Sequence, residues 1–306
     1  MIPVKLIAFP GAPNLPIFAA EENDYFKEAG IGLQMETTPN SAYQIQNLVH
    51  GTFDIAGTAF DNVVAYQEGQ GVAELDREPD LFAFMGATQI ELAFVVAPDI
   101  ATFDDLKGQT IALDALTTGF AFVLYEMLEK AGLSSDDYTM VPVGATPQRW
   151  ESVKTGEHIG TITIEPFTSI AKANGFKVLQ SSSDILSAYQ GGSFAASRAW
   201  AAANPDALKG FIRGYLKGLD WTLDPANRDA GATLLQKRMP QIQPRAINAV
   251  MASLLSPLSG LTPGASIIDE GVTTVLRLRS QFGSGASPLT EPDRYIDLQY
   301  LQNVSI

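Results

Sequence analysis

The sequence predicts an α/β protein of two lobes, each a mainly parallel sheet flanked by helices, with a ligand cleft between the lobes. The length of 306 residues suggests two domains, at about 150 residues per domain. Strand-like and helix-like segments alternate through the first third, which is typical of a parallel sheet with right-handed crossovers. The same order of segments returns in the middle third, so the two lobes share one topology.

The first third reads as strand, helix, strand, helix and strand. Apolar residues at helical spacing predict the first helix, and Gly30 is placed to end it in a left-handed C-cap. Ser41 is a good N-cap for the second helix. The expected strands are 4–9, 32–37 and 53–58, and the expected helices are 17–29 and 42–50.

Two short segments of the first third have counterparts in the middle third. FKEAGI at 26–31 is echoed by LEKAGL at 128–133, and GTFDIAGT at 51–58 by GEHIGTIT at 156–163. Each copy of the first motif closes a helix and leads toward a strand. In the second lobe we expect a strand at 110–113, a helix at 119–131 and a further helix opened by Thr146 and Pro147.

Apolar runs at 81–85 and 92–96 predict strands, and the second of them leads into the second lobe. The chain is expected to return through 193–197, since the residues after Asn204-Pro205 read as helices. The first lobe is therefore discontinuous in sequence. The predicted lobes are 1–88 with 193–306, and 89–192, joined by a hinge in which Gly86, Gly191 and Gly192 absorb backbone rotation.

The net charge of −14 is concentrated near the N-terminus. Residues 1–100 carry 3 basic and 14 acidic side chains, whereas residues 201–306 carry 10 and 9. An acidic surface repels phosphate backbones and anionic lipid heads, so we expect neither nucleic acid nor a membrane surface as a partner.

Residue types missing from the sequence exclude several kinds of chemistry. With no cysteine there are no disulfides, thiolate nucleophiles, Cys-ligated zinc sites or iron–sulfur clusters. His50 and His158 are the only histidines, which excludes a His-rich metal site. We expect no cofactor and no metal. No segment reaches the ~20 apolar residues of a membrane span, and no signal peptide precedes the first strand, so an exported protein would be present here in its mature form.

Six segments, in order along the chain, resemble those of a known family. They are YFKEAGI (25–31), GTFDIA (51–56), FDDLKGQTIA (103–112), LEKAGL (128–133), EPF (165–167) and ANPDAL (203–208). They are similar to segments of the periplasmic solute-binding proteins of ABC importers, in the sulfonate, nitrate, taurine and thiamine-precursor group with the two-lobed type II fold. The resemblance implies a periplasmic or extracytoplasmic monomer that closes over one small molecule and docks transiently on a membrane permease.

Ligands of open α/β sheets bind beyond the carboxyl ends of the strands, where helix N-termini present free N–H groups. The loops expected there are rich in Thr, Ser and Asn, which suit neutral hydrogen bonding to a small ligand. Phe60, Phe120 and Trp150 could enclose its apolar parts, although Trp150 also fits a core or rim position. The predicted ligand-binding residues are Asn14, Asn40, Ser41, Thr58, Phe60, Asp61, Thr88, Thr117, Thr118, Gly119 and Glu165.

The predicted cleft loops contain no Lys or Arg, and this bears on the ligand. Asp61 and Glu165 follow strands and favour a ligand that is neutral or carries hydrogen-bond donors, aromatic molecules included. Either carboxylate could equally be an ordinary helix N-terminal residue stabilised by the helix dipole.

Two other functions fit the same sequence. One is a cytosolic enzyme on this scaffold, similar to the lyases or hydrolases of the menaquinone pathway, with Asp61 or Glu165 as its catalytic carboxylate. The relatives that depend on a Cys-rich segment are excluded by the absence of cysteine. The other is a ligand-sensing domain of a larger protein.

Overall fold

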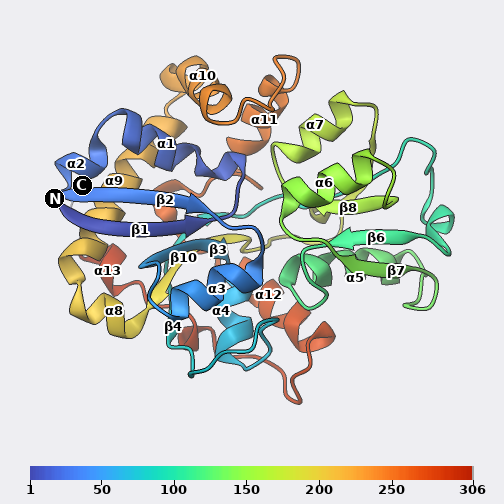
Figure 1. Cartoon of the computed structure of the whole chain (residues 1–306), viewed down its shortest axis with the longest axis horizontal. Coiled ribbons are helices and arrows are strands. Elements are labelled where there is room, and N and C mark those ends of the chain that lie inside the picture. The colour runs from blue at the N-terminus through green and yellow to red at the C-terminus, as the bar shows by residue number, and fades with distance from the viewer. Residues whose placement is uncertain (305–306) are drawn as a thin grey trace.

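In a computed structural model that describes residues 1–304, the strands form two separate five-stranded sheets (Figure 1). The first sheet contains, in spatial order, β2 (Ile31–Thr37), β1 (Ile2–Ala8), β3 (Ile55–Ala59), β10 (Gly192–Ser197) and β4 (Leu81–Thr88). The second contains β7 (Thr139–Pro142), β6 (Thr110–Leu113), β8 (Gly160–Thr163), β5 (Ala93–Val96) and β9 (Lys177–Ser181).

The two sheets are built on the same plan, as the internal sequence echo predicts. In each sheet the first three strands pair in parallel, and the fourth, β10 or β5, is antiparallel to both neighbours. These two antiparallel strands follow the segments that cross between the sheets, since the chain passes from β4 to β5 and returns from β9 to β10. Four of the five strands in each sheet therefore run in the same direction. In this sense each sheet is mainly parallel, which confirms the predicted fold class.

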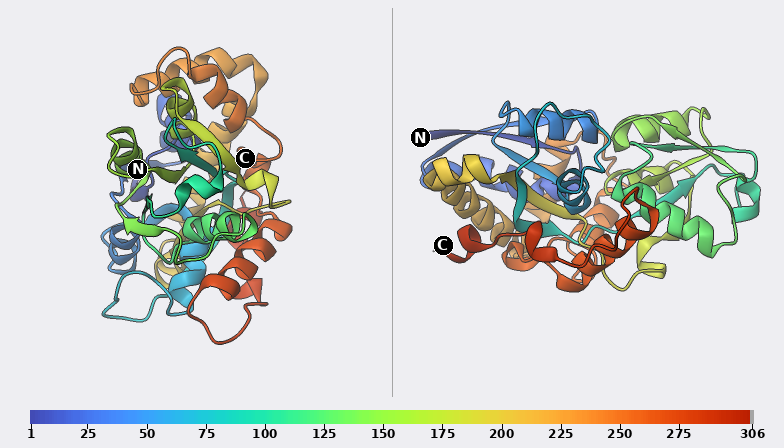
Figure 2. Two further views of the ribbon diagram at one scale, coloured as in Figure 1. Left: turned by 90° about the vertical axis from the view of Figure 1, so that its right-hand side faces the viewer. Right: turned by 90° about the horizontal axis from the view of Figure 1, so that it is seen from below.

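Helices flank both sheets (Figures 1 and 2). Those inserted between strands of the first sheet are α1 (Leu15–Glu22), α2 (Tyr25–Glu28), α3 (Ser41–Val49) and α4 (Phe60–Gln67). The second sheet carries α5 (Gly119–Lys130), α6 (Thr146–Lys154) and α7 (Phe167–Ala173). After β10 come α8 (Arg198–Ala203), α9 (Pro205–Leu223), α10 (Arg228–Arg238), α11 (Ile247–Leu254), α12 (Asp269–Phe282) and α13 (Gln299–Gln302). None of the helices described has the length and apolar character needed to cross a membrane.

The helix expected over 17–29 is divided into α1 and α2. Asp24 interrupts it by adopting a left-handed backbone conformation, with φ of 59°. Asp and Asn tolerate this region better than other non-glycine residues, so the Asn23-Asp24 pair can end one helix and start another. The break leaves α2 to pack on α9, where the rings of Phe26 and Phe211 stack with centroids 5.7 Å apart.

The C-terminal third reaches both sheets. Helix α9 packs along α1 and α2, whereas α12 contacts α4 beside the first sheet and α5 beside the second, and α11 contacts α7. The sheets show which strands belong to the same lobe, but they do not show to which lobe a helix belongs when it contacts elements beside both sheets. The lobe boundaries at 88/89 and 192/193 therefore stay a prediction. The end of the predicted first lobe, 305–306, lies outside the described residues.

Candidate ligand-binding site

A cavity of about 830 Å³, including the space at its open mouth, is lined by residues of both sheets and the loops beyond them. The first sheet and its loops contribute Phe9, Asn14, Ser41, Thr58, Asn62, Ala87, Thr88, Ser193 and Phe194, among others. The segments around the second sheet contribute Ile90, Asp114, Thr118, Gly119, Phe120, Thr146, Arg149 and Ile164.

Strand ends and helix starts place these side chains. Phe9 and Asp114 directly follow β1 and β6, and Thr88 is the last residue of β4. Ser41 and Thr146 are the first residues of α3 and α6. The cavity therefore lies at the carboxyl ends of parallel strands, the edge at which open α/β sheets bind ligands.

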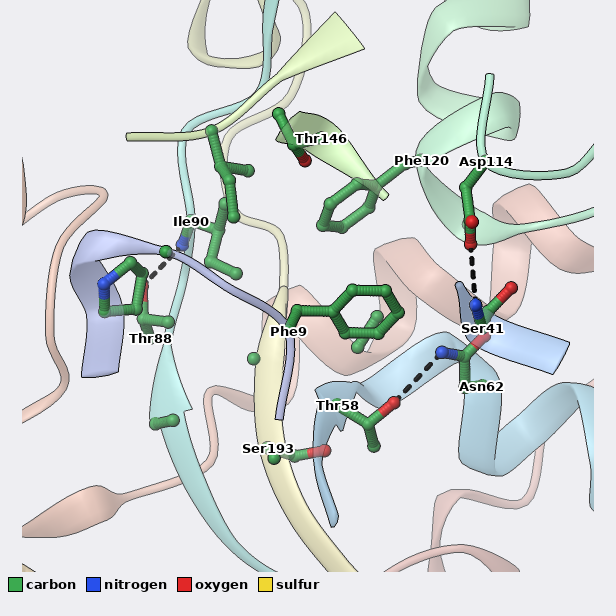
Figure 3. Close-up of a pocket in the computed structure, with 18 of the residues that line it drawn as sticks. Phe9, Ser41, Thr58, Asn62, Thr88, Ile90, Asp114, Phe120, Thr146 and Ser193 are labelled. Atoms are coloured by element: carbon green, nitrogen blue, oxygen red, sulfur yellow. Dashed lines mark hydrogen bonds between the residues drawn. The ribbon is translucent and has the colours of Figure 1, made fainter. Parts of the chain in front are cut away.

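Two phenylalanines reach into the cavity from opposite sheets. Phe9 belongs to the loop after β1, and Phe120 is the second residue of α5 (Figure 3). Both side chains are half-buried, so each keeps ring surface accessible from the cavity. Aromatic rings in this position can stack on a planar ligand or contact its edge.

Asp114 joins the two sheets across the cavity. Its Oδ2 accepts a hydrogen bond from the backbone N–H of Ser41, at 3.1 Å, which satisfies a free donor at the start of α3 (Figure 3). The other carboxylate oxygen, Oδ1, and the Ser41 hydroxyl are buried and have no hydrogen-bond partner among the described residues. An unpaired acceptor and an unpaired hydroxyl thus lie on neighbouring residues of the cavity wall.

Arg149 also lines the cavity, which corrects the expectation of a site without Lys or Arg. Its side chain is 2% exposed and donates from Nη2 to the hydroxyl of Thr146 (2.8 Å) and from Nη1 to the carbonyl of Ile162. Its Nε is buried with no partner within residues 1–304. Burial lowers the pKa of Arg149 to about 10, against the opposing effect of the Asp114 charge. The expectation failed because it considered loops only, whereas Arg149 lies in the first turns of a helix.

Six of the predicted ligand-binding residues line the cavity, and some have their polar groups engaged. The Thr58 hydroxyl accepts from Nδ2 of Asn62 at 2.9 Å, and the Thr88 hydroxyl accepts from the N–H of Ile90 at 2.8 Å (Figure 3). The six are Asn14, Ser41, Thr58, Thr88, Thr118 and Gly119.

Three other predicted residues lie outside the cavity lining. Asn40 is the N-cap of α3, where its side chain accepts from the N–H of Tyr43 at 2.7 Å. Phe60 is fully buried in the hydrophobic core. Thr117 has an exposed side chain, and its carbonyl accepts a hydrogen bond from Arg279 at 2.9 Å. Trp150, likewise considered as an enclosing aromatic, is a core residue that packs edge-on against Phe176.

Asp61 is engaged in a buried ion pair away from the cavity wall. Its two carboxylate oxygens accept from Nε and Nη2 of Arg279, at 2.7 and 2.6 Å, and both side chains are at most 1% exposed. With both oxygens bonded to a guanidinium, Asp61 is placed to hold helices together and not to meet a ligand.

Glu165 lines a second, smaller cavity beside the first. Its carboxylate accepts from the hydroxyl and the N–H of Ser169, at 2.8 and 3.3 Å. Burial raises the pKa of Glu165 above that of an exposed glutamate, although the bonds from Ser169 act in the opposite direction.

Of the predicted hinge glycines, Gly191 lies in the segment that returns from β9 to β10, whereas Gly86 and Gly192 are residues of β4 and β10. A Cβ on Gly191 would come 2.6 Å from the carbonyl oxygen of Gln89, and one on Gly86 would collide with the carbonyl of Ser266. Close packing thus requires glycine at both positions. Beside them Ile90 has φ of 54°, an unusual conformation for a β-branched residue. Rotation about this segment stays a prediction.

Several lining residues were absent from the predicted site. Phe9 and Asp114 each follow a strand, so the strand-end rule that selected the threonines would also have selected them. Asn62 and Arg149 lie on helices, where no sequence signal separates a cavity-facing polar residue from one that faces solvent. Among the described residues, no group of three or more His, Asp or Glu side chains is arranged to hold a metal ion.

Comparison with known proteins supports a solute-binding fold. The family model described as NMT1/THI5 like matches residues 13–228. The riboflavin-binding protein RibY of Chloroflexus aurantiacus is 27% identical over 246 residues, which cover 76% of this chain and 65% of RibY. The match thus spans slightly less than two thirds of that relative.

Solved structures share the fold over nearly their whole length. The periplasmic nitrate-binding protein NrtA from Synechocystis PCC 6803 has a TM-score of 0.82 at 13% identity, covering 99% of this chain and 88% of NrtA. The alkanesulfonate-binding protein SsuA from Xanthomonas axonopodis pv. citri, bound to MOPS, has a TM-score of 0.73 at 16% identity, covering 92% of both chains. The desulfurization enzyme DSZB has a TM-score of 0.65 at 16% identity and covers 98% of each chain. The scaffold therefore carries both binding proteins and an enzyme.

Proposed function

Since this chain belongs to the NMT1/THI5-like family, we propose that it is the solute-binding receptor of an ABC importer and that its cargo is a planar, uncharged aromatic heterocycle. The receptor role follows the family and its structural neighbours, which are mostly binding proteins. The ligand class follows the cavity of this chain. In this proposal the protein is an extracytoplasmic monomer that delivers its ligand to a membrane permease.

The observation that carries the ligand class is the pair Phe9 and Phe120, which reach into one cavity from opposite sheets (Figure 3). A flat ring between them would be contacted by both lobes at once. Offset stacking or edge contact is worth about 0.5–1.5 kcal/mol per pair beyond the apolar area buried. Because the relative RibY is named as a riboflavin-binding protein, a flavin ring is the first probe to try.

The polar groups of the wall favour a ligand without net charge. Arg149 and Asp114 contribute one positive and one negative charge, so their fields largely cancel within the cavity. Nitrate or a sulfonate therefore finds no excess positive charge in the cavity. The wall groups have buried polar atoms, so a ligand would reach them through small rotations of the side chains: Oδ1 of Asp114 can then accept from a ring N–H, while the Ser41 hydroxyl and Arg149 Nε can donate to ring carbonyls. A buried unpaired polar group costs roughly 1–3 kcal/mol, so a ligand that pairs these atoms would gain that free energy.

Ligand capture would couple to closure because the lobes already touch beside the cavity. The N–H of Ala145 donates to the carbonyl of Pro39 at 2.9 Å, and the N–H of Ala12 to the carbonyl of Glu165 at 3.1 Å. A ligand in contact with Phe9 and Phe120 binds this closed arrangement better than one with the lobes apart. It therefore shifts the population toward the closed form, the form that a permease would recognise.

We propose a non-catalytic role. The geometry argues against both carboxylates considered for catalysis, because Asp61 is paired with Arg279 and Glu165 faces the neighbouring cavity. Flavin recovered after prolonged incubation with the protein should be chemically unchanged by liquid chromatography and mass spectrometry.

A direct test is titration of riboflavin with the purified protein, first freed of co-purified ligand by unfolding and refolding. We expect quenching of flavin fluorescence with a Kd of about 1 μM or below. Nitrate and taurine, measured by calorimetry, should give no saturable binding. Tight binding of either compound with no flavin binding would overturn the proposed ligand class and leave the receptor role standing.

A further inference from the structure

A second, smaller cavity adjoins the main one, and its empty space is about 260 Å³ when the solvent at its open mouth is included. The two share four lining residues, Pro13, Thr88, Ile90 and Ile164, so they lie on either side of the same short stretch of wall. The proposed ring site does not use this space. A ligand with a substituent directed past Thr88 would enter it.

The side cavity is lined by two carboxylates. Among residues 1–304 the Glu165 carboxylate accepts hydrogen bonds from Ser169 alone, and Glu91 accepts one from the Ser183 hydroxyl at 3.3 Å. Neither forms an ion pair in the described part of the chain, although Lys172 lies close enough to influence Glu165. Carboxylate oxygens only accept, and each has room for further donors. The cavity therefore offers acceptors that lack a matching cation.

Two half-buried serines complete the polar wall from the C-terminal third. Ser253 lies in α11, and Ser259 follows in the loop after it, where its hydroxyl donates to that of Ser256 at 3.2 Å. Hydroxyls both donate and accept. Carboxylates facing hydroxyls suit a chain whose own groups are hydroxyls, which can donate to the acids and accept from the serines.

We propose that this acidic side cavity binds a flexible, uncharged, polyhydroxyl chain attached to the ring held between Phe9 and Phe120. The assignment rests on the proposed function. With this assignment the side cavity selects an uncharged chain over one that ends in a phosphate, because the phosphate would bring a dianion toward Glu91 and Glu165.

Three flavins that share one ring separate the contributions of ring and chain. Lumiflavin has a methyl group in place of the chain, riboflavin has a ribityl chain, and FMN adds a terminal phosphate. We expect riboflavin to bind about tenfold more tightly than lumiflavin, and FMN to bind about tenfold or more weakly than riboflavin. Fluorescence titration gives all three affinities under one condition.

Variants test whether the difference in affinity between riboflavin and lumiflavin arises in the side cavity. Glu165→Ala should weaken riboflavin binding about five- to tenfold and leave lumiflavin binding unchanged. Glu165→Gln, which keeps an acceptor and loses the charge, should retain most riboflavin affinity and narrow the gap between FMN and riboflavin. Glu157→Ala, an exposed acid beside the second sheet, is the matched control and should change none of the three affinities.

The outcomes distinguish a failure of this proposal from a failure of the proposed function on which it rests. Equal affinity for riboflavin and lumiflavin, in wild type and in Glu165→Ala, overturns the side-cavity assignment while flavin binding stands. Binding of FMN as tight as that of riboflavin does the same. Absence of binding by all three flavins to protein with a native circular-dichroism spectrum overturns the side-cavity assignment and flavin as the ligand, and leaves the receptor role standing.

Discussion

Asp61 and Arg279, which are 218 residues apart in the sequence, meet in a fully buried ion pair in which both carboxylate oxygens accept from the guanidinium. The pair ties α4 to α12. Arg279 also donates to the carbonyl of Thr117, in the loop that leads into α5, and its guanidinium lies 4.8 Å from the centroid of the Phe122 ring. One side chain thus connects helices beside both sheets and supports the loop that carries Thr118 and Phe120 to the cavity.

Asp61→Asn should destabilise the protein strongly, because it leaves the Arg279 charge buried without a counter-ion. The expected loss is about 3–5 kcal/mol in the free energy of unfolding, measured by chemical denaturation. The double variant Asp61→Leu/Arg279→Met should be more stable than Asp61→Asn, since it removes the unpaired charge. Asp104→Asn breaks an exposed ion pair with Lys107 and should cost less than about 1 kcal/mol. An equal effect of Asp61→Asn and Asp104→Asn would contradict the structural role of the buried pair.

Phe120→Ala should weaken riboflavin binding by about tenfold or more, because it removes one of the two rings that reach into the cavity. Phe120→Leu should restore part of the affinity by keeping apolar contact without stacking. Leu116→Ala, at an exposed position in the loop that leads into α5, is the control and should bind as wild type does. Fluorescence quenching gives each Kd. Unchanged binding by Phe120→Ala would remove this ring from the site.

Asp114→Asn tests whether the free carboxylate oxygen receives a ring N–H. Asparagine can still accept from the N–H of Ser41, so the link between the sheets is kept, but an NH₂ group then replaces the free acceptor. Affinity for lumiflavin should fall about tenfold. For 3-methyllumiflavin, which lacks the ring N–H, the variant should change affinity little. Equal losses for both flavins would contradict this contact and indicate a general effect on closure.

The fold was predictable because it depends on local signals repeated in order. Apolar patterns and terminal glycines mark most elements within a few residues, although the N-cap of α3 is Asn40 and not the predicted Ser41, and the sequence echo predicts the matching sheet plans. Asp24 is an exception, since no signal in the sequence predicted that its left-handed conformation would divide the expected helix into α1 and α2.

The ligand-binding site was only partly predictable, because some of its residues depend on contacts between segments that are distant in sequence. Thr58 and Thr88 could be placed at the cavity because strand ends converge there. Arg149 and Asp61 could not, since the surroundings of each come from segments distant in sequence. Asp61 follows β3 as a ligand contact would, yet its partner lies in α12. For Glu165 the sequence left open a ligand contact and an ordinary helix N-terminal carboxylate. The structure shows features of both, since Glu165 accepts from the N–H of Ser169 in α7 and lines a cavity.

The burial of Glu165 also leads to a prediction of how the stability of the ligand-free protein depends on pH. Burial raises its pKa in the folded state above that of an exposed glutamate, with Glu91 adding to the shift and Lys172 opposing it. Above its raised pKa in the folded state the carboxylate is ionised in both the folded and the unfolded chain, and ionisation costs the folded state free energy. Below the unfolded pKa, near about 4.3, it is protonated in both states and that cost disappears.

Glu165→Gln should therefore raise the Tm by roughly 1–3 °C at about pH 7 and by much less at about pH 4, because glutamine carries no charge at either pH and can still accept from Ser169. The difference in Tm between variant and wild type is the quantity to compare, since it cancels the pH dependence of all other groups. Glu157→Gln, at an exposed position, should give a small difference that does not change with pH. A Glu165→Gln effect that is the same at both pH values, or that lowers the Tm at pH 7, would show that Glu165 is not held as a buried, unpaired carboxylate. The side cavity would then lack the acceptor on which its selectivity for an uncharged chain depends.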